Sequence, residues 1–469
     1  MPHAASLALP ADLLDALPAE RWFAGKARRI REVSALDCVA WAPGGSRLWL
    51  VEVVYADGGR ADTYLLIETL AGLERLLDHF FQQTVVDTAR GGRLSFRATT
   101  ALHQTDPQRT RPIELLGAEQ SNTSVRFGDA LIFKLFRRIQ LGGENPEVEI
   151  GRFLTQRTAF TDTPAVAGAL EYAAADGSPA SFGLLQRFVP NRGDAWRGTL
   201  ARLECALAGH PPLDVAIAQA GHTPLDVAIE QARHTPLDVA IEPVRRLGVV
   251  TAKLHLALAS DPSLPSFAPE AIDDADTTAW RAALEAEIRQ TLAALRDRQL
   301  RLDVQPLLER AAGLDALRGA RKTRHHGDYH LGQVLERLDG GFAIIDFEGE
   351  PSRPLAARKE KRSPLRDVAG LLRSLDYARH AALRASGPAD PERVRRADDW
   401  HVQARSAFLD GYLASLEPAA PELLPAPTER LHAALSALEL EKAAYEVRYE
   451  LSHRPDWLPI PLAALQAPG

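Results

Sequence analysis

One stretch of the sequence combines residues suited to phosphoryl chemistry: HGDYHLGQVLERLDGGFAIIDFEGEP, residues 326–351. Asp328 lies in a His-x-Asp triplet, Gln333 follows five residues later, and Asp346 ends the apolar run FAIID. Phosphoryl transfer needs a carboxylate that orients and deprotonates an attacking hydroxyl, and oxygen ligands that hold Mg²⁺ against the phosphates. The pattern therefore predicts Asp328 as the catalytic base and Gln333 and Asp346 as metal ligands.

The elements around these residues must bring the two metal ligands together. A short hairpin with residues 339–341 (Asp-Gly-Gly) as its turn would place Gln333 beside Asp346. The His-x-Asp triplet followed by an amide is a modest signal alone and a strong one when joined to the strand-terminal Asp346. The alternative is that Asp328 and Asp346 are turn residues and that His326 is an ordinary core histidine.

A lysine upstream fits the same chemistry. Lys134 lies in the apolar strand ALIFKLF, where a lysine is costly to bury unless it is paired. A phosphate and a carboxylate would pair it. The following segment, GENPEVEIGRFL, predicts a helix with Asn145 as its cap and Pro146 at its first position. That helix carries Glu147 and Glu149, and helical angles do not decide which of the two pairs with Lys134. An edge-strand lysine pointing to water is the alternative.

Two further segments are candidates for binding a nucleotide. The turn before Lys134, GAEQSNTSVRF, lacks the glycine-rich spacing of protein kinases. It can present hydroxyls and backbone N–H groups to phosphates, although the same residues would make any ordinary turn; they are Ser121, Asn122, Thr123 and Ser124. The apolar run FGLLQRFV is expected to form a strand and an adenine-binding hinge. Adenine is read mostly by backbone groups, so Gln186, Phe188 and Val189 mark only a location.

Length and composition limit the classes of protein to consider. The chain has 469 residues, of which 46% are hydrophobic and 25% charged, as in ordinary globular proteins. The net charge of −7 gives no basic excess that would favour a nucleic-acid partner. Two cysteines cannot build a disulfide framework. Since the start lacks the features of a signal peptide and no apolar run reaches about 18 residues, we expect a cytoplasmic protein without a membrane partner.

Three regions are expected along the chain. Residues 1–110, with strand-like runs at 47–54 and 63–67, predict a small α/β cap subdomain. Residues 111–190 predict a lobe with the phosphate-binding turn, the lysine strand and the hinge, and residues 191–469 a mostly helical lobe. Residues 210–243 contain three copies of a 12-residue unit, such as HTPLDVAIEQAR. Each copy can begin a short helix, and a surface-loop expansion explains them better than a histidine metal array.

The motifs resemble a known family. HGDYHLGQ and DFEGEP resemble the aminoglycoside-phosphotransferase-like kinases, and the full set resembles bacterial maltokinases: RWFAGK, EQSNTS, NPEVEI, SPLRDVAGLLRSLDYA and EKAAYEVRYELSHRPDWLPIPL. The resemblance implies an α+β, bilobal, protein-kinase-like fold with an N-terminal cap and a mostly helical C-lobe. It also implies ATP and Mg²⁺ as cofactors, maltose as the acceptor at its anomeric hydroxyl, and a place in α-glucan synthesis from trehalose with a trehalose synthase as partner. Glu348 becomes a further metal candidate, and Glu149 is favoured over Glu147.

The C-terminal part offers residues for a sugar. Lys442, Tyr445 and Tyr449 are spaced to form one helical stripe, which Glu446 borders. Tyrosines can pack against sugar rings and hydrogen-bond their hydroxyls, although both can equally belong to the core. The resemblance implies that the stripe lines a maltose pocket, with Tyr377 and His326 as further substrate candidates.

Two other functions remain open from the sequence. One is a kinase of the same fold that acts on another sugar, such as glucosamine. An amino sugar should require carboxylates that pair with its ammonium, and the C-terminal helix instead presents Lys442. The other is a pseudokinase that binds ligands without catalysis, which the presence of Lys134, Asp328, Gln333 and Asp346 argues against.

Overall fold

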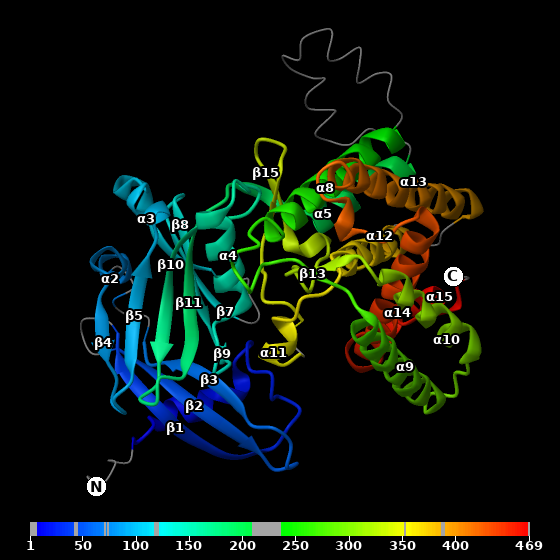
Figure 1. Cartoon of the computed structure of the whole chain (residues 1–469). Helices are drawn as coiled ribbons and strands as arrows, with labels where there is room; N and C mark the ends of the chain where they lie inside the picture. Colours follow the sequence, from blue (N-terminus) through cyan, green and yellow to red (C-terminus); the bar gives the residue numbers. More distant parts are fainter. Residues whose placement is uncertain are drawn as a thin grey trace. The chain divides into compact units, whose positions relative to one another are not determined.

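The computed structural model describes residues 7–41, 46–69, 72, 75–116, 122–208, 236–350, 353–385 and 390–467. The chain divides into two compact units (Figure 1). Unit 1 comprises residues 1–157 and 163–190, and unit 2 comprises residues 158–162 and 191–469. Within the described ranges, no helix is both long enough and apolar enough to cross a membrane.

Unit 1 is built on two antiparallel sheets. The larger sheet has seven strands, in the order β4 (Val85–Asp87), β5 (Arg93–Ala98), β10 (Val166–Ala173), β11 (Pro179–Arg187), β8 (Leu131–Phe136), β7 (Asn122–Phe127) and β6 (Ile113–Leu116). The smaller sheet has the order β1 (Ile30–Ala40), β2 (Arg47–Tyr55), β3 (Asp62–Ile67) and β9 (Arg138–Ile139). The helices of this unit are α1 (Ala11–Ala16), α2 (Leu76–Gln82), α3 (Thr100–His103) and α4 (Pro146–Arg157).

The centre of the smaller sheet is buried on both faces, which explains the run of apolar residues at 48–51 of β2. Leu48 and Leu50 enter a core that also contains Phe96 and Phe133 of the larger sheet. Trp49, with the residues that alternate with it along β2, enters a second core on the other face. Strands of half-buried sheets alternate apolar and polar residues, whereas residues 48–51 of this strand are all buried.

The border predicted at residue 110 does not separate two compact units. β4 and β5 lie before it, yet β5 is hydrogen-bonded to β10, and the strands lie side by side in Figure 1. Residues on both sides of the border also share one hydrophobic core. Composition could not reveal this, because the pairing joins strands that are about 70 residues apart. A cap within residues 1–110 therefore stays a prediction about a subdomain of unit 1.

Unit 2 is mostly helical. Its longer helices are α5 (Ala195–Ala208), α8 (Pro236–Leu258), α9 (Asp274–Arg296), α12 (Leu365–Ala385), α13 (Pro391–Leu416) and α14 (Thr428–His453), and its shorter ones are α10 (Gln305–Ala311), α11 (Leu355–Arg358) and α15 (Pro459–Gln466). β12 (Asn191–Asp194), β15 (Val334–Arg337) and β16 (Phe342–Ile344) form a small sheet, and β13 (Glu270–Ala271) pairs with β14 (Arg321–Lys322). α8 packs along α13 (Figure 1).

The 12-residue copies fall largely on residues 209–235, which lie outside the described residues. The third copy continues into α8, which begins at Pro236. This start agrees with the expectation that each copy can begin a helix with proline in the first turn. The helix runs on for 23 residues through Pro243, so the last part of the third copy belongs to a long helix rather than to a surface loop.

Candidate active site

The loop that carries Asp328 connects β14 to the hairpin of β15 and β16, and Asp367 of α12 fixes its backbone. The backbone N–H groups of His326 and Gly327 donate to the two carboxylate oxygens of Asp367, at 2.7 and 3.0 Å. Gly327 has a φ of +88°, a conformation that suits glycine. A carboxylate beneath two consecutive N–H groups therefore sets the course of the chain just before Asp328.

Asp367 belongs to a buried network. Nε2 of His255 lies 3.2 Å from Asp367, and Nδ1 of the same ring lies 2.9 Å from the Tyr412 hydroxyl. Asp367 is only 1% exposed. Burial alone would raise the pKa of its carboxyl, but the hydrogen bond and the nearby histidines hold that pKa well below its usual range. Asp367 is thus a charged anchor for the loop that carries Asp328, supported from α8 and α13.

Neighbouring contacts hold the rest of the loop against α12. The Leu331 N–H donates to the Ser374 hydroxyl at 3.1 Å, and the Tyr329 and Thr251 hydroxyls are 2.9 Å apart. At Gly370, a Cβ would lie 2.6 Å from the carbonyl oxygen of Tyr329. The loop backbone therefore packs against α12 at a distance that only glycine permits.

His326, predicted to contact substrate, instead belongs to the core. Its side chain is 1% exposed, and Nε2 donates to the carbonyl of Ile345 at 2.9 Å. Nδ1 accepts a longer contact of 3.4 Å from the Asp328 N–H. These partners assign the ring proton to Nε2 and leave no ring nitrogen for a sugar. His326 thus ties the Asp328 loop to the strand before Asp346; sequence alone could not distinguish this core role from a ligand role.

The hairpin brings Gln333 and Asp346 together, as expected. Val334 pairs with Ile344, and the Gln333 Nε2 donates to Asp346 Oδ2 at 3.0 Å. Asp346 has a φ of +67°, which is uncommon for a residue other than glycine and is tolerated best by Asp and Asn. An amide beside a carboxylate is a donor set that suits Mg²⁺. Glu348 is also an oxygen donor of the right type; its carboxylate lies 3.9 Å from Arg358.

His325 is a buried neighbour of this loop. It is 5% exposed, and neither ring nitrogen has a hydrogen-bond partner among the residues that the structure describes. Burial is the main cause that lowers the pKa of His325 to about 3. An unfolded histidine titrates near about 6.5. Between these values the unfolded state binds a proton that the folded state does not, so acidification lowers the stability.

We expect His325→Phe to reduce this loss. The free energy of unfolding, measured by chemical denaturation between pH 6 and pH 4, should fall less steeply than in the wild type, by up to about 1.4 kcal/mol per pH unit. His432→Phe is the matched control, because His432 is exposed on α14, and it should leave the slope unchanged. Equal slopes for wild type and His325→Phe would contradict the assignment.

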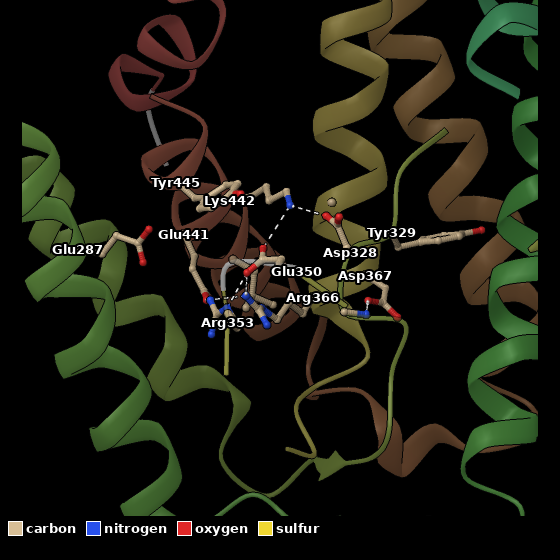
Figure 2. Close-up of a pocket in the computed structure, with 13 residues that line it drawn as sticks. Glu287, Asp328, Tyr329, Glu350, Arg353, Arg366, Asp367, Glu441, Lys442 and Tyr445 are labelled. Carbon is tan, nitrogen blue, oxygen red and sulfur yellow. Dashed lines mark hydrogen bonds and ion pairs between the residues drawn. The ribbon is translucent and has the colours of Figure 1, made fainter. Parts of the chain in front are cut away.

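A pocket in unit 2 opens beside Asp328 (Figure 2). Its lining comes from α9, the Asp328 loop, α12, α14 and the segment after Asp346: Glu287, Gly327, Asp328, Tyr329, Glu350, Arg353, Arg366, Asp367, Gly370, Leu438, Glu441, Lys442 and Tyr445. Lys442 extends from α14 across the pocket, and its Nζ donates to Asp328 Oδ1 at 3.1 Å and to Glu350 Oε1 at 3.2 Å. Burial alone would lower the pKa of Lys442, but these two carboxylates raise it well above its usual value.

A buried cluster of arginines and glutamates forms the floor of the pocket. Arg353 Nε donates to Glu350 at 2.5 Å, and Arg366 lies 3.1 Å from Glu441. Burial alone would raise the pKa of Glu350, but Lys442 and the two arginines hold it well below its usual range. Oε2 of Glu441 has no hydrogen-bond partner among the described residues. The floor is thus ionised, and one carboxylate oxygen is left to accept a hydrogen bond.

The predicted sugar residues separate into two groups. Lys442 and Tyr445 line the pocket, and the Lys442 ammonium lies 5.1 Å from the centre of the Tyr445 ring. Tyr449 follows on the same helix; it is 41% exposed and its ring is 6.4 Å from that of Tyr445.

Tyr377 and Glu446 have structural partners instead. The Tyr377 hydroxyl donates to Glu450 at 3.0 Å, and its ring stacks on Trp457. Glu446 accepts two hydrogen bonds from Arg373, at 3.0 and 2.8 Å. Neither residue lines the pocket. Because the hydroxyl and the carboxylate are already used inside unit 2, the prediction that they bind substrate is not supported by this geometry.

The acidic and basic residues of the pocket floor were not predicted from the sequence. Glu350 lies only four residues after Asp346, and Arg366 lies in the segment SPLRDVAG, so both were within recognised motifs. Glu287 and Glu441 come from two helices that are far apart in sequence. A charged residue is predicted to be exposed to solvent unless its buried ion-pair partner is known. The partners of these residues lie on other helices and segments, so the sequence does not reveal them.

In unit 1, Lys134 pairs with Glu147, the glutamate that the resemblance did not favour. The Lys134 Nζ lies 2.9 Å from Glu147 Oε1, and the two side chains are 12% and 1% exposed. Asn145 caps the helix by accepting the Glu147 N–H at 2.8 Å. The cap directs the first turn of α4 toward β8, so that the residue next to Pro146 reaches the lysine. Helical spacing alone could not make this choice.

The predicted phosphate-binding turn is partly a strand. Asn122, Thr123 and Ser124 begin β7, and Ser121 lies outside the described residues. Ser124 is 0% exposed, which excludes its hydroxyl as a surface ligand for phosphate. The Thr123 hydroxyl accepts a hydrogen bond from Arg137 Nε at 2.8 Å. Ser124 pairs with Lys134 of β8, so the two side chains share one face of the sheet.

The predicted hinge follows the end of β11. Gln186 lies in β11 opposite Ile132 of β8 and is 7% exposed. The strand ends at Arg187, and the Phe188 N–H donates to the Ala130 carbonyl at 2.8 Å. Val189 comes next in the chain, so only the segment after Arg187 has left the sheet.

Comparisons with known proteins give the fold. No known family model matches the chain. A glucosamine kinase from Streptacidiphilus jiangxiensis is 27% identical over 350 residues, which cover 73% of this chain and 70% of that protein. A glucosamine kinase from Mycolicibacterium smegmatis is 29% identical over 374 residues, covering 76% and 79%.

A solved structure of glucosamine kinase in complex with glucosamine, ADP and inorganic phosphate is similar over 99% of this chain and 97% of that chain, with a TM-score of 0.66 and 23% identity. This similarity shows a shared fold. It confirms the predicted class, an α+β kinase fold with a mostly helical C-terminal part.

Proposed function

We propose that this chain is an ATP-dependent sugar kinase in which Asp328 is the catalytic base. The observation that carries the proposal is the position of Asp328: its carboxylate enters a pocket, on a loop whose backbone a buried aspartate holds. The two glucosamine kinase sequences and the shared fold support it.

Each of the candidate site residues has a separate role in the proposed phosphoryl transfer. Asp328 accepts the proton of the attacking hydroxyl. Gln333 and Asp346 would hold Mg²⁺, with Glu348 as a further ligand candidate, and the ion would supply positive charge beside the phosphates of ATP. Lys134, kept in place by Glu147, contacts those phosphates. The backbone after Arg187 binds the adenine, as proposed from sequence for the hinge.

We assign glucosamine as the acceptor. In the sequence, the C-terminal helix presents a lysine and no acidic cluster, which disfavours an amino sugar. The pocket, however, collects carboxylates from several elements: Glu287, Asp328, Glu350 and Glu441. Two of them already hold a primary ammonium, that of Lys442. A substrate ammonium has the same charge and the same donors, so these carboxylates suit it.

Lys442 must withdraw before a sugar can enter. The side chains leave only about 20 Å³ open in the pocket, room for about one or two water molecules. Lys442 is the side chain that spans this space (Figure 2). We therefore infer that the ammonium of glucosamine replaces the Lys442 ammonium between Asp328 and Glu350.

Maltose is the second candidate acceptor. The observation that favours it is the aromatic pair Tyr445 and Tyr449, whose rings are inclined by 25° and offer flat faces along α14. A disaccharide could cover both rings, which a single hexose is too short to do. A trehalose synthase partner belongs to this alternative alone.

Lys442→Met separates the two acceptors. If the ammonium of glucosamine displaces that of Lys442, the ratio of kcat/KM for glucosamine to kcat/KM for glucose should be about 10-fold higher in the variant than in the wild type. The reason is that the ammonium site between Asp328 and Glu350 is already vacant in the variant. The measurement is kcat/KM for glucosamine, glucose and maltose at saturating Mg-ATP. If Lys442 instead binds sugar hydroxyls, the variant should lose activity equally on glucosamine and glucose. An equal loss, with maltose the best wild-type acceptor, would replace glucosamine by maltose.

Lys361→Met is the matched control. Lys361 pairs with Glu270 outside the pocket, so its replacement should leave the ratio of the three acceptors unchanged.

A further inference from the structure

Unit 1 contains a second cleft that the proposed reaction does not use. Its volume is about 420 Å³, within the usual range for small-molecule sites. The cleft lies over β4, β5, β10 and β11 beside α4. Its lining is Val85, Arg93, Ser95, Arg97, Glu144, Arg152, Glu171, Tyr172, Ala173, Pro179, Ala180 and Ser181.

The floor of the cleft is the sheet face that carries Lys134. Residues paired across antiparallel strands point to the same face. One row of such pairs runs through Lys134, Leu184, Ala169 and Arg97. The adjacent row runs through Ser181, Glu171, Ser95 and Val85. The cleft is therefore continuous with the face on which α4 and Lys134 lie.

The charged residues of the cleft are unevenly paired. Arg152 of α4 pairs with Glu171 and, at 3.2 Å, with Glu144. Arg97 makes only a longer contact to Glu171, with 3.7 Å between nitrogen and oxygen. The exposed side chain of Arg93 has no hydrogen bond or ion pair to any residue in the described ranges. Two arginines of β5 thus have donors available for a ligand.

The guanidinium groups of Arg93 and Arg97 come from residues on either side of Ser95, whose hydroxyl also lines the cleft. Arg93, Ser95 and Arg97 alternate along β5 and so share a face. Guanidinium groups beside a hydroxyl are the donors that phosphate monoesters prefer. Glu144 and Glu171 can accept hydrogen bonds from sugar hydroxyls or an ammonium, and Ala173 and Pro179 offer apolar surface to a sugar ring. β5, β10 and β11 are each paired on both sides, so they leave no backbone groups that would read a nucleotide base.

We propose that this cleft binds a sugar phosphate and that the bound ligand regulates α4. The phosphate is held by Arg93, Arg97 and Ser95, and it competes with Glu171 for Arg97 and for Arg152, which also lines the cleft. Arg152 is the link to the helix, because it joins α4 to β10 through Glu171. The same helix carries Glu147, which holds Lys134. A ligand that loosens the Arg152 pair therefore changes the position of Glu147.

The regulatory part rests on the proposed kinase function, since its readout is the affinity for ATP. The reaction product is itself a sugar phosphate, so the cleft would give inhibition by product. We expect the sugar phosphate to raise the KM for ATP by about 3-fold, a coupling typical of allosteric sites. It should do so without competing with the acceptor.

Binding is tested directly by titration calorimetry on the full chain, with glucosamine 6-phosphate, glucose 6-phosphate, inorganic phosphate and ADP as probes. Both sugar phosphates should bind in the presence of saturating ADP. Arg93→Gln and Arg97→Gln should each weaken this binding by about 10-fold or more, since each removes a charge-assisted hydrogen bond. Arg31→Gln, an exposed arginine on β1, is the matched control and should bind normally. The basal kinase activity of all three variants should equal that of the wild type.

Wild-type affinity in Arg93→Gln and Arg97→Gln would overturn the site. Equal binding of inorganic phosphate and sugar phosphates would overturn the ligand class, and so would displacement of the sugar phosphates by ADP. If the chain proved inactive on every sugar, calorimetry would still decide the binding site, so the two proposals fail separately.

Discussion

Asp328→Asn should reduce kcat by about 10³-fold and leave the affinity for ATP nearly unchanged. The amide keeps the shape of the side chain but cannot accept the proton of the attacking hydroxyl, and general bases contribute about 10²- to 10⁴-fold. The Asp328 side chain lies in the pocket with its carboxylate toward Lys442 (Figure 2), and the loop backbone is held by other residues. The fold should therefore survive. Steady-state kinetics and calorimetric titration with ADP measure the two quantities.

Asp339→Asn is the control for this experiment. Asp339 lies at the tip of the hairpin of β15 and β16, where it pairs with Arg337 and accepts the Gly341 N–H. Its replacement should leave kcat within about twofold. Turnover near the wild-type level in Asp328→Asn would remove Asp328 as the base, even if the chain is a kinase.

Asp367→Asn should destabilise unit 2 and disorder the catalytic loop. The buried carboxylate accepts two loop N–H groups and contacts His255. Loss of one partner from a buried charged network costs about 3–5 kcal/mol. We expect a loss of this size in the free energy of unfolding, measured by urea denaturation at pH 7. The kcat should also fall, because the Asp328 backbone loses its anchor.

The pH dependence identifies the charge as the cause. The folded-state pKa of Asp367 is lowered, so its stabilisation is complete above the unfolded value, about 3.9, and is lost only as the pH falls through the folded value. The gap between wild type and Asp367→Asn should therefore be constant above about pH 5 and narrow below about pH 4. Asp410→Asn, on the exposed face of α13, should cost less than about 1 kcal/mol. A gap that widens on acidification would contradict a charged Asp367.

Elements that depend on local pattern could be predicted well from the sequence. The spacing of Gln333, the Asp-Gly-Gly turn and Asp346 predicts a hairpin. The side chains of Gln333 and Asp346 are hydrogen-bonded across it, as expected. The Asn145 cap and Pro146 specified the start of α4. These features depend on neighbours within about 20 residues, so their physics is visible in the chain itself.

Long-range packing decided the rest. Glu147 and Glu149 both lie in the first turn of α4, and the sequence pattern did not decide between them; the placement of α4 brings Glu147 beside Lys134. Histidine is a residue type that often contacts substrates, but His326 is buried against Ile345 and Phe347.

The acidic floor of the pocket is the largest omission. Glu287 and Glu441 come from helices that are more than 100 residues apart, and Glu350 comes from a third segment. A single stripe on α14 therefore gave an incomplete account of which charges face a sugar, and the inference against an amino sugar was built on that stripe alone.

The central claim is phosphoryl transfer to a sugar, and the direct measurement is the fate of labelled γ-phosphate. The purified chain is incubated with Mg²⁺ and ATP labelled at the γ-phosphate, with and without glucosamine, beside Asp328→Asn. We predict that the label moves to glucosamine in the wild type, that it stays in ATP when no acceptor is present, and that the variant transfers about 10³-fold more slowly. Label that remains in ATP or appears only as inorganic phosphate, with glucosamine and with every other sugar, would contradict the account.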